Sequence, residues 1–144
     1  MPVITNTSRA DETRVKALLA ASDLPSEDLT EAHMDDFLSL YDGERLVGCV
    51  GLERYGGNGL LRSLAVESSY RGRGLGSRLL AAIEAQAAAG GVSNLYLLTT
   101  TAEAFFSAHG YLLTERSQVP EVIGRTSEFQ SLCPSSAVCM VSHL

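Results

Sequence analysis

The sequence has no long apolar run and no excess of positive charge, and each absence argues against a class of protein. None of its apolar stretches approaches the ~18 residues that a bilayer span requires. The N-terminus lacks the charged-then-apolar layout of a secretory signal, so we expect a cytoplasmic protein with no membrane partner. The net charge of −6 argues against a general nucleic-acid binder.

Cysteine is also scarce. Cys49, Cys133 and Cys139 make an odd number and lack the spacing of metal ligands, so we expect reduced thiols and no metal. The chain shows no repeat, linker or low-complexity tract. Its 45% apolar and 19% charged residues are ordinary for a globular protein. We therefore predict a single domain over residues 1–144.

Hydrophobic periodicity predicts a series of strands and helices. Strands are expected at 3–5, 36–41, 45–52, 60–66, 95–99, 111–115 and 137–142, and helices at 11–21, 74–89 and 102–109. Residues 25–33 are expected to form a turn with a short helix from Leu29, and 120–125 a helical turn. The dipeptide Asp42-Gly43 indicates a hairpin, and Gly90-Gly91 ends the long helix. Strands followed by alternating strands and helices predict an α+β domain.

The stretch from Leu64 to Leu80 is the most informative part of the chain. A strand ending Leu-Ala-Val is followed by a loop with glycine at positions 72, 74 and 76, and then by an amphipathic segment. Alternating glycines before a helix let the backbone fold around an anion, with N–H groups pointing at it. Arg71 and Arg73 add the charge that a pyrophosphate attracts. The loop is thus predicted to bind phosphate.

The spacing of the loop distinguishes between phosphate-binding motifs. A Walker A loop needs Lys and then Ser or Thr after its last glycine, but Ser77 and Arg78 follow Gly76. A dinucleotide fingerprint needs its third glycine at position 77. The remaining pattern, R-x-x-G-x-G at Arg71, Gly74 and Gly76, resembles the acetyl-CoA loop of the GNAT (Gcn5-related) N-acetyltransferases. The predicted order of elements also agrees with the GNAT fold, a mixed central sheet flanked by helices.

The resemblance implies an acetyl-CoA site built mostly from backbone. In the family, the strand before the loop pairs with the pantetheine arm, and a backbone N–H near its end faces the thioester oxygen. Carried over, these positions are Leu64, Ala65 and Val66. The expected cofactor-binding residues also include Arg71, Gly72, Arg73, Gly74, Leu75, Gly76, Ser77, Phe105 and Phe106.

The catalytic residues are less visible. The family's short helix usually carries a Tyr that protonates the departing thiolate, and Phe106 stands at that position here. Ser107 and His109 lie nearby as candidates, although a His before a helix-ending Gly is commonly a surface cap. Glu53, near the end of a predicted strand, is the candidate general base, taking the ammonium proton through water. Solvated surface is its alternative role.

Arg62 is the candidate for binding the acceptor. It lies two residues before Leu64 and therefore on the same strand face, which in the GNAT fold looks into the acceptor cleft. Burying an arginine among leucines requires an anionic partner. That partner is either a carboxylate or similar oxyanion of the substrate, or an internal Glu or Asp. The sequence leaves both readings open.

Residues 95–106 and 126–140 carry a narrower resemblance. They resemble the small acetyltransferases of bacterial arsenic-resistance operons (the ArsN type) and the acetyltransferase domain of N-acetylglutamate synthase, both of which also have Phe at the helix position. The resemblance implies a glutamate-like acceptor or an analogue such as phosphinothricin or arsinothricin. Arg125 and Ser136 fall roughly where the synthase holds substrate carboxylates.

We therefore expect an acetyl-CoA-dependent N-acetyltransferase acting on a small acidic amine, with a part in arsenic or xenobiotic resistance. The alternatives are acetylation of a peptide or protein, and a non-catalytic coenzyme A-binding module. The cysteines also invite an arsenic-binding interpretation, which the usual burial of free cysteines disfavours. A monomer or homodimer is expected.

Overall fold

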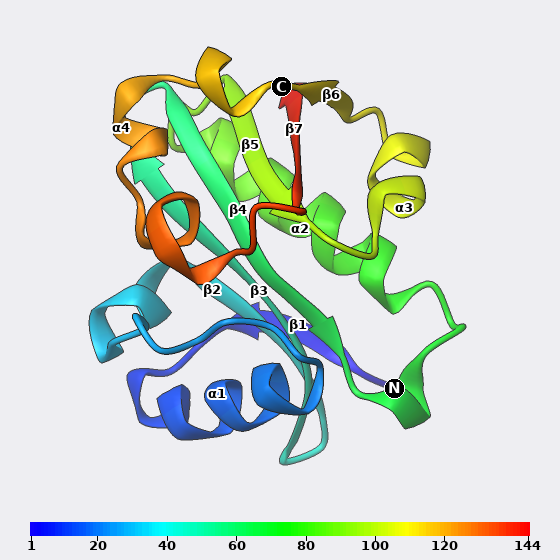
Figure 1. The fold of residues 1–144 in the computed structure, drawn as a ribbon. Helices are drawn as coiled ribbons and strands as arrows, with labels where there is room; N and C mark the ends of the chain where they lie inside the picture. Colours follow the sequence, from blue (N-terminus) through cyan, green and yellow to red (C-terminus); the bar gives the residue numbers. More distant parts are fainter. The chain divides into compact units, whose positions relative to one another are not determined.

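The computed structural model describes all 144 residues (Figure 1). The strands are β1 (Val3–Asn6), β2 (Phe37–Asp42), β3 (Arg45–Tyr55), β4 (Asn58–Val66), β5 (Asn94–Thr99), β6 (Leu112–Thr114) and β7 (Val138–His143). The helices are α1 (Glu12–Ala21), α2 (Leu75–Ala89), α3 (Glu103–Ala108) and α4 (Glu121–Gly124). Short turns of 3-10 helix cover Arg9–Asp11, Glu31–Asp36, Ser68–Tyr70 and Arg116–Gln118. A π-helical turn covers Glu128–Leu132.

The strands form a mixed sheet in the order β1-β2-β3-β4-β5-β7-β6. The β1–β2, β2–β3, β5–β7 and β6–β7 pairs are antiparallel, and β4–β5 is parallel. A parallel neighbour requires a crossover, which α2 provides between β4 and β5. The predicted α+β class with a mixed sheet and helices is confirmed.

The chain divides into two compact units, and the first comprises residues 1–53 and 62–86. In it α1 packs against the strands (Figure 1), since its apolar residues recur three and four positions apart. The buried cluster consists of Val15, Leu18, Leu19, Leu29, Met34, Phe37, Leu46, Cys49 and Ala65. Gly48 lets α2 approach the sheet closely, because a Cβ there would lie 3.1 Å from Leu79 Cδ1.

The second unit comprises residues 54–61 and 87–144. Its central pair is β5 and β7, which run side by side from Asn94↔His143 to Thr99↔Val138 (Figure 1). Gly110 follows the end of α3 with φ +92, a conformation that favours glycine. Phe106 and Tyr111 pack edge to face on either side of this turn, with ring centroids 5.5 Å apart.

Element boundaries agree with the sequence predictions to within a few residues. Strand β3 is longer than predicted and ends at Tyr55, so Glu53 lies inside it. The short helix predicted from Leu29 corresponds to the 3-10 turn at 31–36. The π-helical turn at 128–132 was not predicted, because a short turn carries too little hydrophobic periodicity. No helix is long and apolar enough to span a membrane. That residues 1–144 form a single domain stays a prediction.

Candidate active site

The predicted phosphate loop is an open turn at the start of α2. Gly72 and Gly74 have φ angles of +81° and +74°, which L residues rarely adopt, and a Cβ at either position would contact nothing within 4 Å. The glycines therefore serve backbone conformation rather than close packing. Helix α2 begins at Leu75, and the Arg78 N–H donates to Gly74 O at 3.2 Å. The first-turn N–H groups of a helix point outward toward an anion.

Contacts with the preceding strand and the β2–β3 hairpin hold the loop in place. Arg71 Nε donates to Val66 O at 2.9 Å, which bends the loop back onto the end of β4. The Tyr70 hydroxyl donates to Asp42, and the Arg73 guanidinium lies 5.1 Å from the Tyr70 ring centroid. Both loop arginines are exposed. The arrangement suits a pyrophosphate, which needs backbone N–H donors and cations on a fixed frame.

Strand β4 is interrupted just before the positions expected to face acetyl-CoA. Ser63 is buried with φ +61°, a left-handed conformation in the middle of a strand. The expectation that Arg62 and Leu64 share one face assumed an unbroken strand, and this residue breaks the alternation. Arg62 is 3% exposed, whereas Leu64 is only half-buried. The regular alternation on which the face-sharing argument for Arg62 depends is therefore absent at this point of β4.

Arg62 lies between two carboxylates. Its Nη1 and Nη2 donate to the two oxygens of Asp28 at 2.6 and 2.8 Å. Nη1 also donates to Glu53 Oε2 at 2.7 Å, and Nε donates to Ser63 Oγ at 3.2 Å. The internal ion pair, one of the two readings left open by the sequence, is thus present. The same contacts bring two predicted site residues, Glu53 and Arg62, together.

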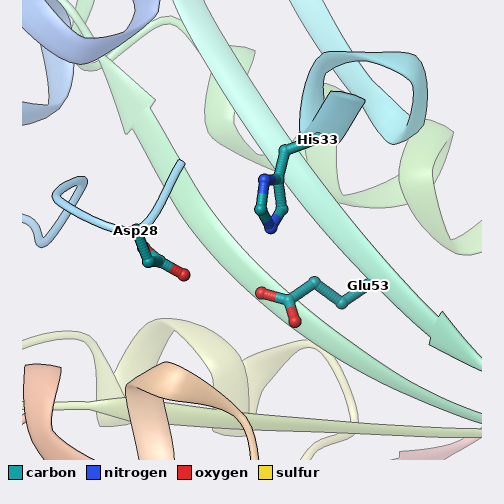
Figure 2. A group of neighbouring side chains, drawn as sticks. All are labelled: Asp28, His33 and Glu53. Atoms are coloured by element: carbon teal, nitrogen blue, oxygen red, sulfur yellow. The ribbon is translucent and has the colours of Figure 1, made fainter. Parts of the chain in front are cut away.

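His33 faces this cluster from the 3-10 turn at 31–36. Its Nδ1 accepts the Thr30 backbone N–H at 3.0 Å, so the proton of the neutral imidazole sits on Nε2. Figure 2 shows the other ring nitrogen directed at Asp28 and Glu53. Ligand atoms of these three residues lie within 4.8 Å of one another. A metal ion there would have to displace the Arg62 guanidinium, which already binds both carboxylates.

The charge of Arg62 acts on Asp28. Burial raises the pKa of this carboxyl, but the hydrogen bonds and charge of Arg62, with smaller contributions from a backbone hydrogen bond and from His33, outweigh burial, and the pKa lies below its ordinary value. The carboxylate is therefore ionised at neutral pH. Glu53 forms the second salt bridge to Arg62, so one guanidinium faces two carboxylates.

The remaining candidates lie in the second unit. His109 Nδ1 lies 2.8 Å from Phe105 O, and the His109 ring packs on the Phe105 ring at 4.5 Å, so His109 caps the end of α3. Phe106 is buried and Ser107 is exposed. Arg125 pairs with Glu121 on the surface, and Ser136 is exposed. Catalytic or substrate roles for these residues stay predictions.

The sequence did not indicate Asp28 and His33 as site residues, because both fall in the stretch predicted as a turn with a short helix from Leu29. No spacing rule connects them to Arg62, which follows Asp28 by 34 positions. The buried arginine was the one available signal, since it requires an anionic partner somewhere in the chain. The buried arginine alone does not indicate which carboxylate is that partner.

The cysteines are not set up as a thiolate site. Burial raises the pKa of the Cys49 thiol to about 12 and that of the Cys139 thiol to about 11. Cys49 donates its S–H to Ser63 O at 3.3 Å. Soft metal ions bind the thiolate rather than the thiol, so the protonated state of Cys49 and Cys139 disfavours arsenic binding at these two residues.

Comparisons with known proteins agree with one another. A family model described as "Acetyltransferase (GNAT) domain" matches residues 34–112. An uncharacterized N-acetyltransferase of Bacillus subtilis, YjcF, is 31% identical over 107 residues, covering 72% of this chain and 76% of the relative. An amino-acid acetyltransferase of Neisseria meningitidis is 30% identical over 108 residues, covering 74% of this chain and 24% of the relative.

Among solved structures, N-acetylglutamate synthase from Neisseria gonorrhoeae, complexed with coenzyme A and N-acetyl-glutamate, superposes with a TM-score of 0.86 at 24% identity. All of this chain is covered, but only 35% of the synthase chain. At this identity the likeness shows a shared fold. The chain thus spans about a third of the synthase chain and a quarter of the Neisseria meningitidis relative.

Proposed function

The chain belongs to the GNAT acetyltransferase family and takes acetyl-CoA as its co-substrate; from this premise we propose that it acetylates the amine of a small acidic amino acid or of a glutamate analogue such as phosphinothricin or arsinothricin. Acetylation of such analogues would give the protein a part in arsenic or xenobiotic resistance. We further expect it to act in the cytoplasm as a monomer or homodimer. The observation that carries the acceptor proposal is the buried guanidinium of Arg62 bound to two carboxylates.

The donor half of the reaction uses the glycine loop. Bound acetyl-CoA supplies a thioester whose carbonyl carbon is attacked by the amine nitrogen while the C–S bond breaks. Loop N–H groups, with Arg71 and Arg73, would hold the pyrophosphate. The backbone of Leu64, Ala65 and Val66 would place the thioester, since β4 leads directly into the loop.

Glu53 is our proposed general base. An ammonium group must lose a proton before its nitrogen can attack, and Glu53 offers a largely buried carboxylate whose Oε2 is fixed by Arg62. The released coenzyme A thiolate needs a proton in return. Phe106 cannot donate one, but a thiol with a pKa of ~8.5, by analogy with cysteine, leaves as a tolerable thiolate that water can protonate.

Binding of the acceptor is proposed to depend on charge. A carboxylate, phosphinate or arsinate group carries the negative charge that an arginine fork binds in two places. Arg62 supplies this fork next to Glu53, so an acidic acceptor bound there would bring its amine near the base. We propose Arg125 and Ser136 as further contacts to the acceptor. The name of the Neisseria meningitidis relative, an amino-acid acetyltransferase, supports the same acceptor class.

A thiol-release assay tests this proposal. Purified protein with acetyl-CoA is offered glutamate, phosphinothricin, arsinothricin, neutral amino acids and lysine peptides. We expect release with one or more acidic acceptors and little with neutral ones. Thiol release with lysine peptides alone would contradict the acidic acceptor and indicate a protein substrate. Coenzyme A binding without turnover on any amine would instead favour a non-catalytic module.

Changing Gly74 to alanine is expected to weaken acetyl-CoA binding. A left-handed φ costs an L residue about 1–2 kcal/mol, or roughly tenfold in affinity. The loop would relax away from its +74° conformation, because no neighbouring atom constrains a Cβ there. The measurement is the KM for acetyl-CoA, which should rise about tenfold.

Gly56→Ala is the matched control. Gly56 has φ +65° and equally open surroundings, but it lies in the β3–β4 turn. It carries the same strain without touching the loop, so its KM for acetyl-CoA should stay at the wild-type value. If the KM for acetyl-CoA rises equally in both variants, the effect of Gly74→Ala is due to general destabilisation.

A further inference from the structure

Arg62 meets more negative charge than it can neutralise. One guanidinium binds two carboxylates, so the formal charges of Asp28, Glu53 and Arg62 add up to −1. The Arg62 side chain is 0% exposed and the carboxylate side chains are 15% and 11% exposed, so water screens the excess only in part. Adding a third carboxylate beside the first two would meet strong like-charge repulsion. A substrate anion can reach Arg62 only if a resident carboxylate leaves.

The two resident carboxylates are held differently by the backbone. Glu53 lies within β3, a strand of the sheet. Asp28 lies between α1 and the 3-10 turn at 31–36, in a segment with no helix or strand. Its two oxygens engage Nη1 and Nη2 of Arg62 together, the bidentate arrangement that a free carboxylate adopts on arginine. Asp28 is thus the carboxylate that resembles a ligand and the one on the freer backbone.

We propose that Asp28 is a specificity-determining residue whose carboxylate occupies the place on Arg62 that the acceptor's anionic group takes, and which leaves Arg62 when the acceptor binds. This inference rests on the acidic acceptor of the proposed function. The exchange keeps the Arg62 guanidinium paired with two anions throughout, so this buried cation is never left without a counter-charge.

His33 gives the displaced carboxylate a second partner. The Thr30 N–H holds Nδ1 as an acceptor, which leaves Nε2 as the donor of the neutral ring. That side of the ring faces Asp28 and Glu53 (Figure 2), and the three residues' ligand atoms lie within 4.8 Å of one another. A small rotation of the Asp28 side chain would therefore exchange a charged partner for a neutral donor.

The exchange predicts how acceptors are discriminated. An amine without an anionic group leaves Asp28 and Arg62 paired and gains nothing at this position. An acidic acceptor binds, but more weakly than it would if Asp28 were not paired with Arg62. Removing the charge of Asp28 should therefore strengthen the binding of acidic ligands, whereas loss of a merely structural residue would weaken it.

The test measures binding of glutarate, a dicarboxylate with no amine, by calorimetry in the presence of coenzyme A. Asp28→Asn should bind glutarate about tenfold or more tightly than wild type, since the repulsive charge is gone. Arg62→Lys, which keeps the charge but loses the fork, should bind it more weakly than wild type. In turnover, Asp28→Asn should lower the KM for acidic acceptors and leave the KM for acetyl-CoA unchanged.

Asp35→Asn is the matched control. Asp35 is bound through both oxygens to Arg9, but on the surface, so this variant removes the same charge without affecting Arg62. Its glutarate affinity should equal that of wild type. Unchanged or weaker binding in Asp28→Asn, with Arg62→Lys still impaired, would overturn the exchange and leave the acidic acceptor standing. Equal glutarate binding in all the variants would remove Arg62 from the acceptor site and overturn both proposals.

Discussion

Glu53→Gln should lower kcat by about 100-fold or more, the usual loss when a positioned general base is removed. The amide keeps an oxygen that accepts the Arg62 Nη1 hydrogen bond, so the side chain should stay in place. It cannot take a proton from the ammonium group of the acceptor. The rate is measured with acetyl-CoA and acceptor both saturating, which separates the loss of proton transfer from weaker binding.

The KM for acetyl-CoA should be unchanged in Glu53→Gln, because the loop that binds the donor is built from other residues. Glu12→Gln removes a carboxylate from the surface pair with Lys16 and serves as the control, with kcat expected at the wild-type value. A Glu53→Gln enzyme with kcat within threefold of wild type would eliminate Glu53 as the base. Proton removal by solvent would then be the simplest account.

Arg62→Met should be the most destabilising single change, lowering the free energy of unfolding by about 3–5 kcal/mol at neutral pH. Methionine fills much of the volume but removes the guanidinium that Asp28 and Glu53 share. Both side chains are mostly buried, so solvent relieves little of the repulsion. Urea unfolding followed by circular dichroism measures the loss.

The same variant should change the pH dependence of stability. In the wild type, Arg62 holds the pKa of Asp28 below its ordinary value, despite burial. The stabilisation from this carboxylate is therefore fully present above its unfolded pKa of about 3.9 and is lost as the pH falls through the folded pKa. In Arg62→Met the repulsion between the two carboxylates is instead relieved when Asp28 takes up a proton. The stability gap between the two proteins should narrow as the pH falls from 7 toward about 4.

A second substitution checks the cause. Adding Asp28→Asn to Arg62→Met removes one of the two carboxylates that Arg62 binds in the wild type, so part of the lost stability should return at neutral pH. If the double variant is no more stable than Arg62→Met, the loss comes from packing around residue 62. An Arg62→Met protein within 1 kcal/mol of wild type would show that the buried ion pairs add nothing net.

Much of the fold could be predicted because its signals are local. The β2–β3 hairpin follows Asp42-Gly43, and Gly43 has the φ of +63° that such turns require. Helix α2 begins at Leu75, one residue after the predicted start, because the glycines that precede it fix its N-terminus. The prediction failed at Ser63. A serine carries no sequence mark of the left-handed conformation that breaks the alternation of β4.

The donor site was determined by the sequence itself. Its parts are adjacent in the chain, since a strand, three alternating glycines, two arginines and a helix start follow one another within seventeen residues, from Leu64 to Leu80. Backbone N–H groups and a helix terminus need no distant partner to form an anion site. The tertiary structure added the anchors, Val66 O for Arg71 and Asp42 for Tyr70.

The surroundings of Arg62 were decided only by the tertiary structure. The sequence required an anion for a buried arginine but left open whether a substrate or the chain supplies it. The fold brings Asp28 from a turn 34 positions earlier and Glu53 from the preceding strand. Contacts between such distant residues depend on how strands and turns pack, which no local pattern encodes. The donor loop could thus be read from consecutive residues, whereas the acceptor side required the folded chain.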